Sequence, residues 1–351
     1  MTGRYILYKD HLRGFLRKLG RMGSLIAPVS TLQGDVLLQE VDSVDSFDIE
    51  LSTQPQNSPK AIIFPQYEVL FEYTIDKDGR YRFKERIHGD PLIFFAIRPC
   101  DLSAILYLDV KFLQRPRDPY YLKRRADSVM IVLGCNDPGE NCFCNSTGTG
   151  PFLQFGYDLQ LTDLGDRFFV ETGRVKGEEI VSRWPQFFRP ATQEDVRQQY
   201  QKSLEARTSF KRTVHVEAAF RIMEQGRLDE RIWKDIAIRC HGCGGCAYVC
   251  PTCACFTIED RPRDKGIGER VRMWDACTHH GFTRLAGGVN PVDVMSDVLR
   301  QRFMHKLFYD YKRFGRPGCV GCGRCVDICF GGADIVSFVS TLVSTEVVYG
   351  T

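Results

Sequence analysis

Apolar and polar residues alternate in short blocks over the first 210 residues, and most blocks have the length of one strand or one helix. Residues 92–97 and 129–134 are continuously apolar, which is typical of strands covered on both faces of a sheet. Between them, residues 101–112 carry apolar side chains at helical spacing. The pattern therefore predicts a β-α-β unit whose two strands end at the same edge of the sheet.

Three other blocks predict one helix and two hairpins. Apolar residues in 10–20 recur at helical spacing. Residues 68–85 alternate in polarity around an Asp-Gly turn at 78–79, which is typical of a hairpin. Residues 159–170 predict a second hairpin with its turn at 163–165.

The chain beyond residue 210 has a different pattern. Residues 195–236 are helical in periodicity, and 293–314 place apolar residues at i, i+3 and i+4 along one face before a glycine. We place a domain boundary near residue 210. The expected architecture is an α/β N-terminal domain over 1–210, followed by a mostly helical domain over 211–351.

Cysteine is the unusual component, with 15 residues in three groups. Four lie between 100 and 144, seven between 240 and 277, and four between 319 and 329. Disulfide frameworks are typical of short exported chains. This chain is long, and its start lacks the basic, apolar and small-residue regions of a secretory signal. The grouping therefore favours metal or redox chemistry.

Two of the groups repeat the spacing Cys-x2-Cys-x2-Cys-x3-Cys. The first three cysteines of such a run surround three irons of a [4Fe-4S] cubane, and in two-cluster ferredoxins the fourth binds the other cluster. Glycines inside both runs let the backbone approach closely. We therefore expect two [4Fe-4S] clusters, one held by Cys240, Cys243, Cys246 and Cys329, and the other by Cys319, Cys322, Cys325 and Cys250.

Zinc is the main alternative for this motif. Zinc sites use Cys-x2-Cys in two pairs per ion, whereas here a third cysteine follows each pair at the same step. Phe330 stands where a proline usually follows the second run, but proline binds no iron, so the expected ligands are unaffected. Residues 251–318 separate the two runs, which indicates a dicluster ferredoxin-like domain larger than a compact ferredoxin.

The N-terminal domain contains four further cysteines, Cys100, Cys135, Cys142 and Cys144. Two follow the predicted strands of the β-α-β unit, at the sheet edge where sites of open α/β sheets lie. Four thiolates there could hold a third [4Fe-4S] cluster. A zinc ion and buried thiols without a ligand are the alternatives that the spacing leaves open.

Three cysteines remain, Cys253, Cys255 and Cys277, the last followed by His279 and His280. They could form a fourth metal site with one of the histidines. Buried thiols lining the cluster domain are the simpler interpretation, and the one that we favour, because free cysteine is among the most buried residue types.

Other classes of site lack support in the sequence. A net charge of +3 is too small to indicate nucleic-acid binding. No apolar run reaches the ~20 residues of a membrane span, so we expect a cytoplasmic protein. No Gly-x-Gly-x-x-Gly follows a predicted strand, so no flavin or NAD site is expected on this chain.

Five segments together resemble one family: 98–105, 142–151, 240–256, 274–277 and 319–325. Their combination and order are similar to the β subunit of cytoplasmic sulfhydrogenases, which are NADP-type nickel–iron hydrogenases, and to its counterpart in anaerobic sulfite reductase. The resemblance covers about residues 5 to 340 and includes the four N-terminal cysteines, which favours a shared [4Fe-4S] ligand set. Thr147 departs from the family pattern, where methionine is frequent.

The resemblance implies an electron-transfer subunit without an active site of its own. Such a subunit relays single electrons between a flavoprotein resembling NAD(P)- or ferredoxin-reductases and a catalytic subunit of hydrogenase or sulfite reductase type. The alternatives are a catalytic subunit with an open iron in its N-terminal cluster, a subunit of a flavin complex of the heterodisulfide reductase kind, and a zinc-binding interaction module.

Overall fold

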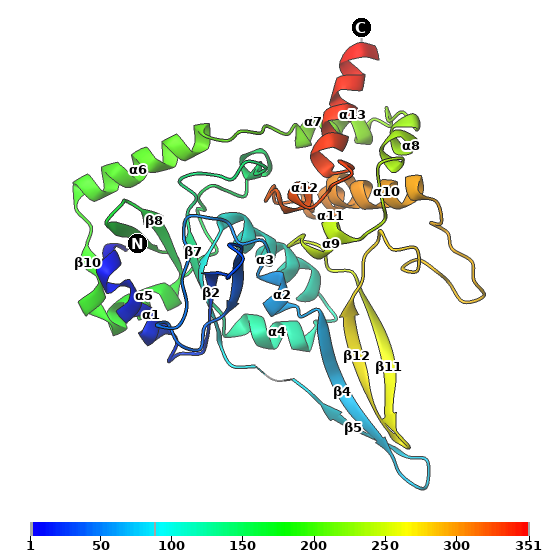
Figure 1. Cartoon of the computed structure of the whole chain (residues 1–351), viewed down its shortest axis with the longest axis horizontal. Coiled ribbons are helices and arrows are strands. Elements are labelled where there is room, and N and C mark those ends of the chain that lie inside the picture. Colours follow the sequence, from blue (N-terminus) through cyan, green and yellow to red (C-terminus); the bar gives the residue numbers. More distant parts are fainter. Residues whose placement is uncertain (1–2, 88, 350–351) are drawn as a thin grey trace.

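A mixed eight-stranded sheet forms the first half of the chain in the computed structural model, which describes residues 3–87 and 89–349 (Figure 1). Its strand order is β10-β1-β9-β8-β7-β6-β2-β3. The four central strands β2, β6, β7 and β8 run parallel, and antiparallel strands flank them on both sides. The strands are β1 Arg4–Tyr8, β2 Ser24–Ser30, β3 Val36–Glu40, β6 Leu92–Ile97, β7 Val129–Leu133, β8 Leu159–Asp163, β9 Arg167–Thr172 and β10 Arg189–Pro190.

The predicted β-α-β unit is confirmed. Strand β6 leads into helix α3 (Pro99–Phe112) and then, through α4 (Pro119–Ala126), into the parallel neighbour β7. Helices α3 and α4 pack on one face of the sheet with the short helix α2 (Lys60–Ile63). Helices α1 (Leu12–Leu19) and α5 (Val175–Arg183) pack on the opposite face. Both faces of β6 and β7 are therefore covered, which explains why these strands are continuously apolar.

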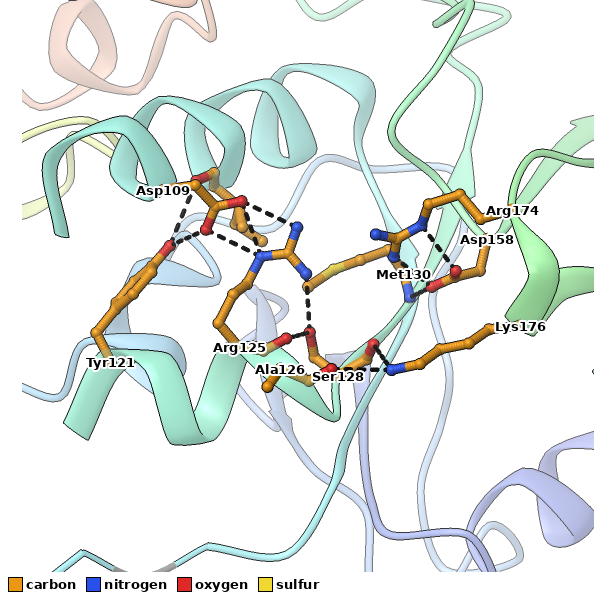
Figure 2. Close-up of polar contacts among 10 residues, drawn as sticks. Asp109, Tyr121, Arg125, Ala126, Ser128, Met130, Asp158, Arg174 and Lys176 are labelled. Atoms are coloured by element: carbon orange, nitrogen blue, oxygen red, sulfur yellow. Dashed lines mark hydrogen bonds and ion pairs between the residues drawn. The ribbon is translucent and has the colours of Figure 1, made fainter. Parts of the chain in front are cut away.

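Two carboxylates, partly buried Asp109 and fully buried Asp158, fasten the β-α-β unit to its surroundings (Figure 2). Asp109 of α3 accepts hydrogen bonds from Tyr121 Oη at 2.8 Å and Arg125 Nε at 3.0 Å, both from α4. Asp158, just before β8, accepts two bonds of 2.9 Å from Arg174 and one from the start of the β7 main chain. These contacts fix α4 against α3 and the register of β7 beside β8.

A second sheet joins segments that lie far apart in the sequence. The predicted hairpin at 68–85 is confirmed as β4 (Tyr67–Ile75) and β5 (Tyr81–Glu85). It pairs with a second hairpin, β11 (Phe256–Asp264) and β12 (Ile267–Trp274), in the order β11-β12-β4-β5. Figure 1 shows the two hairpins side by side, projecting together from the rest of the molecule.

The expectation of a mostly helical C-terminal domain is not confirmed, because this part of the chain contains the hairpin β11–β12. Its first strand is almost wholly exposed and carries charged residues on both faces, so its sequence lacks the alternation that predicts a strand. Antiparallel pairing between β12 and β4 supports the hairpin instead. The boundary near residue 210 stays a prediction and falls between helices α6 (Gln193–Thr208) and α7 (Val216–Glu224).

The remaining elements are mainly helical. Helices α8, α10 and α13 meet around Trp233, Phe303 and Phe338, whose rings stack at centroid distances of 4.9 and 4.7 Å. The segment predicted as one helix over 293–314 is helical, but a π-helical turn interrupts it. These elements are α6 Gln193–Thr208, α7 Val216–Glu224, α8 Arg231–Ala237, α9 Gly245–Tyr248, α10 Met295–Met304, η4 His305–Tyr309, α11 Asp310–Phe314, α12 Arg324–Asp327 and α13 Ile335–Tyr349, with short 3-10 turns at η1 Lys9–His11, η2 Cys144–Thr147 and η3 Pro185–Phe187.

None of the helices within 3–87 and 89–349 combines the length and the apolar character of a membrane span. The cytoplasmic location stays a prediction.

Candidate metal centres

The first cysteine run lies in the loop before α9 and at the start of that short helix. A surface cavity is lined by its first three cysteines and by Cys329, which follows α12. Gly242 and Gly244 adopt positive φ values of +64° and +75°, a conformation that favours glycine and lets the loop curve tightly. The structure thus brings together the four thiols that the sequence assigns to one cluster: Cys240, Cys243, Cys246 and Cys329.

The second run forms a more buried group. Burial raises the pKa of the Cys322 thiol to about 12, and the neighbouring Cys250 thiol contributes to the rise. Burial raises the pKa of Cys319 and Cys325 as well, again with Cys250 among the groups that contribute. The Gly321 N–H donates to the Cys319 sulfur at 3.4 Å. Cys250 of the first run therefore lies near the cysteines of the second, and its binding to the second cluster stays a prediction.

The spacing of these thiols suits a cubane better than a single ion. Within the described residues, no three Cys, His, Asp or Glu side chains lie close enough to share one metal ion. A [4Fe-4S] cubane binds each thiolate at a different iron, so its ligands surround a volume instead of converging on a point. Cys240, Cys243, Cys246 and Cys329 line one cavity, which is compatible with four ligands at separate irons. Ligation by the individual thiolates stays a prediction.

The four N-terminal cysteines also form one group. Cys100 opens α3 and Cys135 follows β7, so both lie at the same sheet edge. Burial raises the pKa of Cys142 to about 11, with Cys135 as the next cause, and burial likewise raises that of Cys144, with Cys135 and Cys142 contributing. Burial, Asp101 and Cys144 together raise the pKa of Cys100.

Gln54 is a polar neighbour of this group that the sequence did not single out. Its amide nitrogen donates to Cys100 Sγ at 3.6 Å, and its amide oxygen accepts from Cys142 Sγ at 3.5 Å. Gln54 lies in an irregular segment between β3 and α2, and no motif marks it.

The N-terminal group lies directly against the second cysteine run. The Phe143 N–H donates to the Gly321 carbonyl at 2.8 Å, and the Thr149 hydroxyl donates to the Val320 carbonyl at 2.7 Å. A Cβ at Gly321 would lie 2.5 Å from the Phe143 carbonyl oxygen, so only glycine allows this approach. The Cys322 thiol is also among the charges that raise the pKa of Cys100.

Two buried cations lie beside the cysteines of the second half. Lys306 Nζ donates to Cys250 Sγ at 3.3 Å, to Thr252 Oγ1 at 3.0 Å and to the Gly318 carbonyl at 2.9 Å. Arg302, one helical turn earlier, donates to Cys253 Sγ at 3.7 Å and to the Cys246 carbonyl at 3.0 Å. The sequence reasoning missed both residues. The available signal was two basic residues four apart in a helix whose other face is apolar.

The three remaining cysteines line a second cavity together with Arg302 and Lys306. The two histidines proposed as partners lie elsewhere. His279 Nδ1 contacts Asp275 Oδ1 at 3.2 Å, and His280 is bonded through its carbonyl to Asn290. Neither imidazole is among the side chains that line this cavity; the cysteines that do are Cys253, Cys255 and Cys277.

Comparison with known proteins agrees with this arrangement. A family description of the 4Fe-4S dicluster domain matches residues 239–333, which contain both cysteine runs, and such a domain implies two [4Fe-4S] clusters. Over 333 residues the chain is 30% identical to Sulfhydrogenase 2 subunit beta of Pyrococcus furiosus, covering 93% of this chain and 94% of that protein. Similarity of this extent, together with cysteine groups that match the dicluster spacing, means that the chain belongs to the sulfhydrogenase β-subunit family.

Proposed function

We propose that this chain is an electron-transfer subunit that holds three [4Fe-4S] clusters in a row. It works between a flavoprotein resembling NAD(P)- or ferredoxin-reductases and a catalytic subunit of hydrogenase or sulfite reductase type. The observation that carries the proposal is the contact between successive cysteine groups. The N-terminal group touches the second run through Gly321, and Cys250 of the first run lies near Cys319 of the second.

The chain's own residues hold and shield the clusters. Cys240, Cys243, Cys246 and Cys329 are the ligands of the first, and Cys319, Cys322, Cys325 and Cys250 those of the second. When bound, a [4Fe-4S] cluster accepts or releases one electron at a potential set by hydrogen bonds, burial and charge. Ligands of the third cluster are Cys100, Cys135, Cys142 and Cys144.

The cysteine groups of the first and second clusters differ in their exposure to solvent. Cys243 is exposed, and the cavity that it lines opens at the surface. Large apolar side chains are exposed beside it, with Phe330 at 76% and Ile328 at 43%. Cys319 and Cys322, in contrast, are buried between the other two groups. Exchange with a partner therefore takes place at the Cys243 end, and the middle group is kept from solvent.

A catalytic role through an open N-terminal iron is less well supported. Such a site needs a cluster with only three protein ligands, whereas four thiols gather at the N-terminal group. A zinc-binding module also finds little support, because no three thiols in the described part of the chain meet at one point. The chain alone should bind no flavin.

Serine substitutions test the proposal. We expect Cys243→Ser, Cys322→Ser and Cys142→Ser each to lower the iron and acid-labile sulfide of anaerobically prepared protein by about four per chain, the content of one cubane. Each should also stop electron transfer in the assembled complex. Zinc in place of iron, flavin on the isolated chain, or turnover without partner subunits would contradict the proposal.

A further inference from the structure

We propose that Cys255 and Cys277 form a redox-active thiol pair, which low-molecular-weight disulfides oxidise to an intramolecular disulfide. Cys255 is the thiol that attacks the external disulfide, and Cys277 is the thiol that resolves the product. The inference assigns a role to two cysteines that the repeated motif leaves unused. It goes beyond the proposed electron-transfer function and does not depend on it.

The fold places the two cysteines across the base of the hairpin β11–β12. Cys255 lies directly before β11, and Cys277 lies shortly after the end of β12. The ladder between these strands starts at the pair of Phe256 and Trp274. Just outside that pair, the Asp275 N–H donates to the Cys255 carbonyl at 3.0 Å. Backbone pairing thus brings together two cysteines that the whole hairpin separates in the sequence.

The side chains of the two cysteines contact each other. The thiol and the main-chain N–H of Cys277 both donate to the sulfur of Cys255. Cys253, the third cysteine of the cavity, is hydrogen-bonded instead to Cys250, a predicted ligand of the second cluster. In the part of the chain that the structure describes, no three metal-binding side chains could hold an ion together. The arrangement therefore favours chemistry between two sulfurs over metal binding.

The two thiols of the pair differ in reactivity. The hydrogen bond from Cys277 lowers the pKa of the Cys255 thiol despite its partial burial, and the charge of Lys306 lowers it further. The same hydrogen bond, followed by burial, raises the pKa of the Cys277 thiol. Cys255 is half-buried in the wall of a cavity that opens to solvent, whereas Cys277 is only 6% exposed. Because the thiolate is the nucleophile and must be accessible, Cys255 reacts first.

The oxidation consists of two thiol–disulfide exchanges. The Cys255 thiolate attacks one sulfur of the external disulfide and forms a mixed disulfide, and the other half leaves as a thiolate that takes up a proton. Cys277 then loses its proton and attacks the Cys255 sulfur, and the second half leaves and is protonated in the same way. Two protein thiols are oxidised to one disulfide, and the external disulfide is reduced to two thiols.

The interpretation as buried, unreactive thiols therefore fits Cys277 but not Cys255. The test uses the full chain with its clusters, prepared without oxygen and incubated with glutathione disulfide. Differential alkylation and peptide mass spectrometry should show the loss of two free thiols, at Cys255 and Cys277, and a cross-link between their peptides. Iron and acid-labile sulfide should stay unchanged. Persistence of both free thiols would overturn the proposal, as would loss of iron during the oxidation, because it would identify these cysteines as cluster ligands.

Two variants distinguish attack from resolution. Cys277→Ser lacks the resolving thiol, so Cys255 should retain one glutathione. In Cys255→Ser, the buried Cys277 should stay unmodified. The matched control is Cys253→Ser, which removes the third cysteine of the same cavity and should still form the disulfide. A stable adduct on Cys277, or a disulfide that includes Cys253, would contradict the assigned roles.

The measurement on the parent protein does not require any variant to fold, so it decides the proposal even if a serine variant does not. It also separates this inference from the proposed function. Loss of a cluster in Cys243→Ser or Cys322→Ser would leave the oxidation of Cys255 and Cys277 unaffected. Absence of the disulfide would leave the electron-transfer role unaffected.

Discussion

The guanidinium of Arg324 forms a two-pronged ion pair with the carboxylate of Asp101, with Nη1···Oδ1 at 2.5 Å and Nη2···Oδ2 at 3.0 Å. Arg324 lies between the second and third cysteines of the second run, and Asp101 directly follows Cys100. Both side chains are buried, and Arg324 Nε also donates to the Pro55 carbonyl at 2.9 Å. The pair therefore joins the N-terminal cysteine group to the second run at the point where two clusters would adjoin.

Replacing Arg324 by methionine should destabilise the protein strongly. The change leaves the Asp101 carboxylate buried without a partner, which typically costs about 3–5 kcal/mol. We expect a lower thermal midpoint in anaerobic unfolding, with iron lost from both adjoining groups at lower temperature. The double variant Arg324→Met with Asp101→Asn should recover part of the loss, because it removes the unpaired charge.

The matched control is the exposed pair of Arg270 and Asp260 on the hairpin β11–β12. It has the same two-pronged geometry, at 2.7 and 2.6 Å, but both side chains are about half exposed. Arg270→Ala should therefore cost less than about 1 kcal/mol. An equal loss of unfolding free energy in the two arginine variants would show that burial does not determine the contribution of the Arg324 pair to stability.

The sequence predicted the parts of this arrangement that follow from local pattern. Continuous apolar runs located β6 and β7, and the rule for parallel strands placed Cys100 and Cys135 at one edge. The cysteine spacing grouped Cys329 with Cys240, Cys243 and Cys246, and these four side chains line one cavity; that they bind one cluster stays a prediction. These predictions needed only periodicity and a known ligand pattern.

The parts that escaped prediction depend on contacts between distant segments. The exposed strand β11 has no alternating pattern, and the hairpin is supported by pairing of β12 with β4, about 200 residues earlier in the chain. Gln54 meets the N-terminal thiols from an irregular segment. Lys306 looks like an ordinary surface residue in the sequence, and only the fold buries it beside Cys250.

The fourth cysteine of each run is predicted to bind the cluster of the other run. Substitution of Cys329 should therefore affect the same cluster as substitution of Cys240. Both line the first cavity although they lie far apart in the chain, so both should bind the same cluster. We expect Cys329→Ser and Cys240→Ser to alter the same signal in electron paramagnetic resonance, and Cys250→Ser to alter the signal that Cys319→Ser alters. If Cys329→Ser instead perturbs the signal sensitive to Cys319, the fourth cysteine stays with its own run.

Lys306 should raise the reduction potential of the cluster that Cys250 binds. Its ammonium lies 3.3 Å from Cys250 Sγ and stabilises the reduced cluster, which carries one more negative charge. Lys306→Met removes this charge, and we expect the potential to fall by on the order of 60 mV, equivalent to a tenfold change in a one-electron equilibrium. Redox titration of the purified chain measures the shift.

An exposed lysine in the next turns of the same helical segment provides the control for that substitution. Lys312 pairs with Glu224 at 2.6 Å, and its side chain is 54% exposed. Lys312→Met should leave all cluster potentials unchanged within a few mV, because solvent screens an exposed charge. A rise in potential on Lys306→Met, or an equal shift in both variants, would rule out direct stabilisation by Lys306.

Asp158 should be important for stability through its contacts with Arg174 and the β7 main chain (Figure 2). Its side chain is wholly buried, and it accepts bonds from Arg174 and from the Met130 N–H at 2.7 Å. Asp158→Ala leaves that N–H without an acceptor, and a buried donor in this state costs about 1–3 kcal/mol. We expect a lower thermal midpoint at unchanged iron content.

The iron content of Asp158→Ala is the decisive measurement, because it distinguishes an effect on global stability from an effect on cluster binding. Lys123→Ala, which breaks an exposed pair with Asp127, is the control and should change the midpoint little. Asp158 supports the register of β7 beside β8, and β7 leads directly to Cys135. Loss of about four irons in Asp158→Ala at temperatures well below its midpoint would mean that this register, and not only global stability, positions Cys135 for its cluster.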